Sequence, residues 1–174
     1  MLTAASLVVA LVGVGVGVFS FISLNNYITE ANAYVRPMAR VYYGGPSYTI
    51  PSGAWRVFDY DQKSYDTHGT FNLTSESYSV PEAGFYQVIV QFSIDAIAGD
   101  YFMIRLYSNT FIICTRAYSS SLNTINFVVA LTDINNFTEG DSLTIRVYQW
   151  NSGATSRNIR EGERQTFFTV TKIA

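Results

Sequence analysis

Three aspartates that lie close together in the sequence are the residues best placed to do chemistry. Asp59, Asp61 and Asp66 share one short segment with Tyr60 and Tyr65. Paired carboxylates can act as general acid and base in hydrolysis, and loop carboxylates can hold a calcium ion. The simpler interpretation is that these side chains line a loop between strands and keep it solvated. We therefore predict no catalytic residue, and keep a hydrolytic domain using these carboxylates as an alternative.

The other reactive side chains are too few to build a familiar site. The chain has one His and one Cys, so an internal disulfide and a structural zinc site of His and Cys are both excluded. His68 precedes Gly69 in a predicted surface turn, and Cys114 follows an apolar run that favours a buried strand position. The N-terminal glycines lack the strand and the lysine of a phosphate loop. We expect a protein that is not an enzyme, with no metal and no cofactor.

The charge balance argues against nucleic acid as a partner. Eleven Lys and Arg residues stand against thirteen Asp and Glu residues, which gives a net charge of -2 at pH 7. Such a chain offers no basic stripe to neutralise phosphates. The densest group of charges, between Arg157 and Arg164, has mixed sign and predicts a solvated loop or a salt-bridged contact.

Most of the chain shows the alternation that is typical of half-buried β-strands. The clearest strand covers residues 84–94, in which large apolar residues share one face: Tyr86, Val88, Val90, Phe92 and Ile94. The same period of two recurs at residues 102–106, 125–131, 143–147 and 166–173, with Gly, Asn or Ser turn signals between them. Strands at this spacing, with no helical pattern between them, predict an all-β sandwich or jelly roll.

The N-terminal segment has a different composition. Every charged side chain lies at or after Glu30, and residues 7–24 form an apolar run interrupted only by Gly and Ser. As a helix this run would be roughly 27 Å long, close to the thickness of a bilayer core. It could be a signal peptide, a transmembrane anchor or a helix packed inside a protein assembly. A signal peptide is disfavoured because no Lys or Arg precedes the run.

A retained helix is therefore the prediction for this segment. Gly13 and Gly17 form a GxxxG pair that permits close approach of helix backbones, and we place Phe19 and Phe21 with them as assembly residues. Residues 1–28 would contact a membrane or the core of a capsid or filament. Pro37 ends the helical pattern. The predicted division is a hydrophobic helix and stalk at residues 1–36 and a β domain at residues 37–174.

Several segments of the β region resemble C1q/TNF-like jelly rolls, and they occur in that family's order. The residues that carry the resemblance are Trp55, Phe58, Tyr65, Gly69, Phe71, Pro81, Gly84, Tyr86, Gly140, Asp141 and Phe168. The resemblance implies a mainly β fold, a C1q/TNF-like jelly-roll sandwich of about eight to ten antiparallel strands. A long N-terminal apolar α-helix would precede it.

The resemblance also implies a class of function, although a fold hosts many functions. Domains of this family usually form compact trimers and serve as extracellular recognition heads. Residues 24–42 and 50–59 look most like versions attached to phage tail or fibre proteins. This implies a spike, fibre or decoration protein of a virion surface, a homotrimer or higher assembly that faces a host receptor or glycan. The alternative is a pilin-like subunit of an extracellular cell-surface filament, with apolar helices in the filament core.

Overall fold

A computed structural model describes residues 34–46 and 48–174, and every regular element in these ranges is a β-strand. The chain divides into two units at Val35 and Arg36, and the second unit is the β domain. The predicted N-terminal helix, with Gly13, Gly17, Phe19 and Phe21, lies outside the described residues. Within the described part of the chain, no helix has the length and apolar character needed to cross a membrane.

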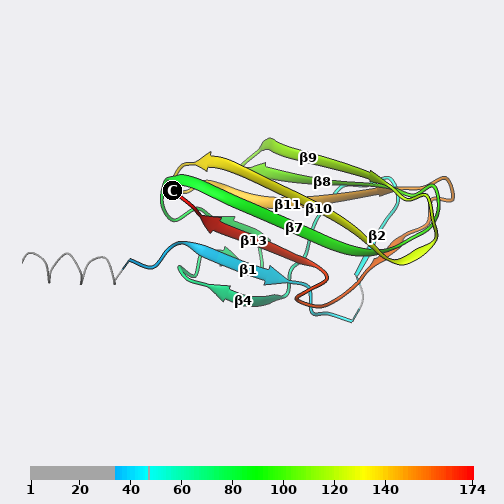
Figure 1. The fold of residues 1–174 in the computed structure, drawn as a ribbon, viewed down its shortest axis with the longest axis horizontal. Coiled ribbons are helices and arrows are strands. Elements are labelled where there is room, and N and C mark those ends of the chain that lie inside the picture. Colours follow the sequence, from blue (N-terminus) through cyan, green and yellow to red (C-terminus); the bar gives the residue numbers. More distant parts are fainter. Residues whose placement is uncertain (1–33, 47) are drawn as a thin grey trace, which may run out of the picture. The chain divides into compact units, whose positions relative to one another are not determined.

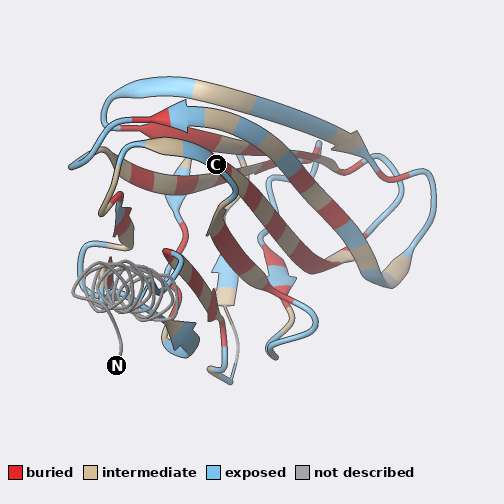
Figure 2. Cartoon of the chain, turned by 60° about the vertical axis from the view of Figure 1, so that its left-hand side comes forward, coloured by how far each residue is buried: buried red, intermediate tan, exposed pale blue. Residues whose placement is uncertain are grey.

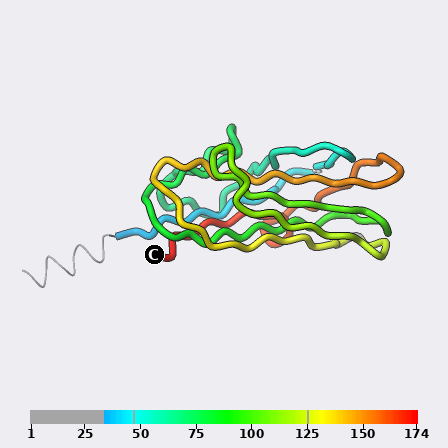
Figure 3. The backbone as a smooth tube through the Cα atoms, turned by 90° about the horizontal axis from the view of Figure 1, so that it is seen from above, coloured from blue at the N-terminus to red at the C-terminus, as the bar shows by residue number. Residues whose placement is uncertain are grey.

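The β domain consists of two sheets that lie in separate layers along its long axis (Figure 3). The seven-stranded sheet contains β1 (Met38–Tyr42), β2 (Tyr48–Ile50), β4 (Gln62–Asp66), β7 (Gly84–Ala96), β10 (Thr124–Phe137), β12 (Arg157–Ile159) and β13 (Phe167–Lys172). The six-stranded sheet contains β3 (Arg56–Val57), β5 (Phe71–Asn72), β6 (Ser77–Ser79), β8 (Tyr101–Ser108), β9 (Phe111–Ser119) and β11 (Ser142–Trp150). All pairings between these strands are antiparallel.

The strand orders place β10 and β9 at edges of their sheets. In the seven-stranded sheet the order is β2-β12-β7-β13-β1-β4, and β10 pairs with β7 along its length (Figure 1). In the six-stranded sheet the order is β5-β6-β11-β8-β9, and β3 also pairs with β11. These connections between strands distant in sequence confirm the predicted mainly β sandwich.

The prediction of about eight to ten strands was too low, because the described residues form thirteen. The surplus comes from five strands of two or three residues: β2, β3, β5, β6 and β12. β2 pairs with β12, and β5 pairs with β6, so most of these short segments pair with each other. They are too short to show an alternating pattern in the sequence.

The long strands form because their apolar residues alternate and the two sheets bury the apolar sides against each other. Along β7, burial alternates from Tyr86 to Phe92, as predicted, and β8 and β11 show the same pattern (Figure 2). Fully burying one such side chain contributes roughly 1.5–3 kcal/mol. The core therefore lies between β7, β8 and β11, which are the central strands of the two layers.

An aromatic cluster fills one region of this core. The ring of Phe58 is completely buried, and its centroid lies 4.7 Å from those of Tyr60 and Phe92 and 4.8 Å from that of Tyr48. Tyr43 approaches Phe58 edge-on at 5.9 Å. Edge-on and tilted contacts of this kind add to the stabilisation from area burial alone.

Both ends of the chain segment that forms the domain lie at the same end of the sandwich. The N–H of Lys172 donates to the carbonyl of Pro37 at 2.9 Å, and the N–H of Phe85 donates to the carbonyl of Ala174 at 2.7 Å. Gly84 permits this approach, because its φ is +150° and an added Cβ would lie 2.4 Å from the Ala174 carbonyl oxygen. The loops at residues 97–100, 120–123 and 151–156 lie at the opposite end (Figure 1).

Candidate functional site

The outward side of the seven-stranded sheet exposes several large apolar side chains. Phe85 on β7 is 49% exposed, and Val128 and Ile134 on β10 are 50% and 53% exposed. Register places Ile134 opposite Gln87, so these side chains share one surface. We call the outward positions of residues 85–91 on β7, 128–136 on β10 and 167–171 on β13 the neutral face: Phe85, Gln87, Ile89, Gln91, Val128, Ala130, Thr132, Ile134, Asn136, Phe167, Thr169 and Thr171. Asp95, further along β7, lies beyond this face and pairs with Arg160.

No residue of the neutral face is ionisable, and Arg40, which lies beside it, is already engaged. Arg40 on β1 lies opposite Thr169, and its guanidinium carbon lies 3.9 Å from the centroid of the Phe167 ring. The same guanidinium donates to the Glu163 carbonyl at 2.7 Å and lies 3.8 Å from its carboxylate. Apolar side chains are stabilised by burial, and neutral amides and hydroxyls cost far less to bury than ions do, so this surface is suited to contact with another protein surface.

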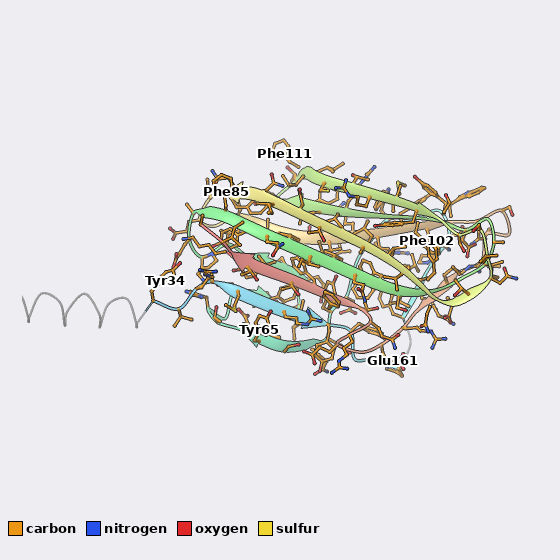
Figure 4. The ribbon with its side chains drawn as sticks, viewed as in Figure 1. Tyr34, Tyr65, Phe85, Phe102, Phe111 and Glu161 are labelled. Carbon is orange, nitrogen blue, oxygen red and sulfur yellow. The ribbon has the colours of Figure 1, made fainter. Side chains whose placement is uncertain are left out.

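The edge strands β9 and β10 face each other along one side of the sandwich. Tyr118 on β9 donates its hydroxyl proton to the carbonyl of Ala130 on β10 and so links the two sheets. Cys114 is half-buried and packs against the core, close to the predicted small apolar role. Burial and the nearby carboxylate of Asp133 raise the pKa of this thiol, which keeps it protonated and unreactive at neutral pH. Phe111, at the start of β9, is 73% exposed and points away from the ribbon (Figure 4).

The three aspartates of the predicted carboxylate group do not form one site. Asp66 anchors the turn that follows β4, because it accepts hydrogen bonds from the N–H groups of Thr70 and Phe71 and from the Lys63 ammonium. Burial raises the pKa of Asp66, but these hydrogen bonds outweigh burial and leave it below its ordinary value. Asp61 accepts a hydrogen bond from the Gly44 N–H at 2.6 Å. Both carboxylates therefore hold loops.

Asp59 instead lies beside a carboxylate that the sequence did not single out. Glu76 accepts a hydrogen bond from the Tyr60 N–H at 2.8 Å and has a φ of +54°, a conformation that L-residues seldom adopt. Burial is the main cause that raises the pKa of Glu76, to about 7, and the neighbouring Asp59 adds to it. Within residues 34–46 and 48–174, no three His, Cys, Asp or Glu side chains gather as a metal site requires.

Glu76→Gln is expected to change how stability depends on pH. Because the folded state raises the pKa of Glu76 from 4.5 to about 7, folding favours its protonated form, and stability contributed by this group falls as pH rises through that interval. The stability of the variant should not decrease over this pH interval on account of residue 76. At pH 8 the variant should be more stable than wild type by about 1 kcal/mol, a value reduced for solvent screening. Urea denaturation at pH 5 and pH 8 measures it.

Glu76→Ala is the control, because alanine also removes the acceptor for the Tyr60 N–H. It should lose stability at pH 5, where Glu76→Gln should not. An unchanged pH dependence in Glu76→Gln would contradict the assignment.

A pocket of about 620 Å³ opens at the loop end of the domain. Asp95, Asn123, Arg157 and Asn158 are among its lining residues. Asp100 is only 1% exposed and pairs with the lining residue Arg157 through two hydrogen bonds of 2.5 and 2.8 Å. The expectation of a solvated loop for Arg157 was wrong, because its side chain is 90% buried in this ion pair. The buried bidentate pair with a carboxylate fixes the orientation of this guanidinium.

Comparison with solved structures shows which known fold the domain has. The domain is similar to the Eiger TNF of S. frugiperda (TM-score 0.59, 16% identity), over 80% of this chain and 94% of that one. It is also similar to the globular domain of the zebrafish complement 1qA protein (TM-score 0.59, 13% identity), over 80% and 98% of the two chains. The domain is a C1q/TNF-like jelly roll. Murine APRIL matches it too (TM-score 0.59, 9% identity), over 80% of this chain and all of that one.

The resemblance to C1q/TNF-like jelly rolls that was predicted from the sequence is thus confirmed at the level of the fold. No family model and no curated protein sequence matches the chain, so the fold is recognised from its three-dimensional structure. The sequence identity to these three structures is only 9–16%.

The residues predicted as the signature of the jelly roll occupy three environments. Four belong to the buried core: Phe58, Phe71, Tyr86 and Phe168. Gly69, Gly84 and Gly140 have positive φ, and Asp141 accepts a hydrogen bond from the Thr138 N–H across the turn before β11. Trp55 and Tyr65 are partly exposed, and Pro81 lies in the loop before β7. The residues of the first two groups therefore fill the core or shape turns, although they lie far apart in the sequence.

Proposed function

We propose that the protein is a non-enzymatic structural and recognition protein that works as a homotrimer or higher assembly. The neutral face is the observation that carries this proposal. Its half-exposed Phe85, Val128 and Ile134 lie on a surface with no ionisable side chain. Removing apolar area from water drives association, and no charge has to be desolvated. The trimer is the assembly that the resemblance to C1q/TNF-like domains implies.

We place this assembly outside the cell, on a virion surface as a spike, fibre or decoration protein. Residues 1–28 would anchor the chain in a membrane or capsid, and Gly13, Gly17, Phe19 and Phe21 would pack within that anchor. The two ends of residues 36–174 lie together at one end of the sandwich. A domain held through residue 36 would therefore offer the opposite end, with its pocket, to a host surface.

A pilin-like filament remains the second candidate, because an apolar N-terminal run could also pack into a filament core. Electron microscopy of the native material separates the two. Discrete assemblies on virus particles support the virion proposal. Long polymers from cells that carry no virus support the filament instead.

Val128→Lys is expected to weaken self-association at least about tenfold, because it would bury an unpaired ammonium in the contact. Val57→Lys is the matched control: Val57 is also an exposed valine, at 40%, but it lies on the six-stranded sheet. The measurement is the mass of the full-length assembly by light scattering over a dilution series. A mild detergent is included at constant concentration to solvate the N-terminal segment.

Two results would contradict the proposal. A wild-type protein that is monomeric throughout the series would remove the assembly altogether. If Val128→Lys and Val57→Lys dissociated to the same extent, the contact between copies would not lie on the neutral face.

A further inference from the structure

The outward side of the six-stranded sheet is chemically unlike the neutral face. The strands of this sheet contain four arginines, Arg56, Arg105, Arg116 and Arg146, and not one Asp or Glu. The whole chain has more acidic than basic residues, so this segregation leaves the sheet locally positive. Local potential, rather than net charge, decides what a surface attracts.

Two of these arginines lie side by side on the outward surface. Register pairs Arg105 on β8 directly with Arg146 on β11. Like charges directly opposite each other destabilise a sheet, so the pair has a cost within the isolated domain. We call the surface around them the arginine face: Trp55, Tyr101, Met103, Arg105, Tyr107, Thr144, Arg146, Tyr148 and Trp150.

Aromatic rings hold both guanidinium groups in place. The guanidinium carbon of Arg105 lies 4.1 Å from the centroid of the Trp55 ring, and that of Arg146 lies 4.3 Å from the Tyr107 centroid. Trp55 in turn contacts Tyr148 at 5.2 Å. Cation–π stacking of this kind limits the motion of a guanidinium while leaving its N–H edge available to a ligand.

Neither arginine has an acidic partner among the described residues. Arg40, Arg157 and Arg160 all form ion pairs, whereas no carboxylate lies within 4.0 Å of Arg105 or Arg146. The Nε atoms of Arg105 and Arg146 are also buried without a hydrogen-bond acceptor. A ligand on the outer surface cannot reach these two Nε atoms, so it would be bound by the terminal Nη groups of the two guanidiniums.

We propose that the arginine face binds an acidic saccharide. A carboxylate or sulfate group would accept hydrogen bonds from Arg105 and Arg146, which supplies the missing negative charge. Sugar rings would lie against Tyr148 and Trp150, of which Trp150 is 48% exposed. These residues lie on one strand, two and four positions from Arg146, so they are about 7 and 13 Å away along it.

Two other occupants fit this surface less well. A single-stranded nucleic acid needs a run of cations that follows its backbone, and the arginine face offers one adjacent pair. A second copy of this chain would be expected on the neutral face, where no charge is buried. The saccharide site and the assembly contact therefore use opposite sheets, and one can fail while the other holds.

The experiment is a fluorescence titration, because both tryptophans of the chain, Trp55 and Trp150, lie on the arginine face. The full-length protein is titrated with sialyllactose, which carries a carboxylate, with a sulfated heparin hexasaccharide, and with neutral lactose. A thymidine oligonucleotide is the fourth probe. We expect saturable binding of at least one acidic sugar, none of lactose, and weakening by added salt.

The variants test the residues. Arg105→Gln combined with Arg146→Gln should weaken binding at least about tenfold. Arg116→Gln is the matched control, because Arg116 lies opposite Ile104, outside the arginine face, and should change binding less than about twofold. The double variant should fold as well as wild type, since it removes a like-charge pair; its thermal transition checks this.

Each remaining result would overturn the proposal. If lactose bound as tightly as the acidic sugars, charge would not determine binding. If Arg116→Gln weakened binding as much as the double variant, the arginine pair would not be the binding site. Binding of no sugar at all would also overturn it. Binding of the oligonucleotide alone, with loss in the double variant, would assign the face to nucleic acid instead.

Discussion

Asp100→Ala is expected to lower the free energy of unfolding by about 3–5 kcal/mol. The carboxylate is buried, and it accepts two hydrogen bonds from Arg157 and a third, of 2.7 Å, from the Ile97 N–H. Alanine would leave a buried guanidinium without a counter-charge and would remove the acceptor that closes the 97–100 turn. Urea denaturation of the full-length protein, followed by circular dichroism, measures the loss.

Asp95→Ala is the matched control for Asp100→Ala. Asp95 also pairs with an arginine, Arg160, at 2.9 Å, and it lines the same pocket, but both side chains are about one-third exposed. Pairs in contact with water contribute about 0–1 kcal/mol. If the two variants lost equal stability, the burial of the Asp100 pair would not be the cause.

Phe58→Ala is expected to cost about 3–5 kcal/mol, because it empties a fully buried position. The lost ring contacts Tyr43, Tyr48, Tyr60 and Phe92, which come from four separate segments of the chain. The sheets are held on both sides of this ring and cannot close the cavity completely. The midpoint of urea denaturation should fall accordingly, with an unchanged slope if the cavity alone is responsible.

Phe111→Ala removes the same ring from a position that is 73% exposed. Its effect should stay within about 0.5 kcal/mol. A large loss in Phe111→Ala, or a small one in Phe58→Ala, would contradict the placement of Phe58 at the centre of the aromatic cluster.

The two outward faces of the sandwich suggest a division of tasks. The neutral face has apolar, amide and hydroxyl side chains and no ionisable group, whereas the arginine face has two cations without an acidic partner in residues 34–46 and 48–174. We propose that copies of the chain contact each other through the neutral face and that the arginine face binds the ligand. Binding of an acidic saccharide by the Val128→Lys variant, compared with wild type, would show whether the two surfaces act independently.

The sequence predicted much of the fold because the relevant signal is local. Alternation along residues 84–94 is visible residue by residue, and it became the buried and exposed sides of β7. The positive φ of Gly69 and Gly140 matches the turns predicted around them. Strand pairings of two or three residues could not be predicted, since a segment such as Arg56–Val57 is too short to show a period.

The sequence by itself determined that the chain is rich in β-strands, that it has an uncharged N-terminal segment, and that an internal disulfide and a structural zinc site of His and Cys are excluded. Only the tertiary structure decided which side chains meet. Arg157 is buried with Asp100, 57 residues away, Glu76 lies against Tyr60, and Arg105 lies opposite Arg146. These neighbours are set by the register between strands and by the packing of two sheets. A period of two along one strand assigns each residue to a face but carries no information about its partner on another strand.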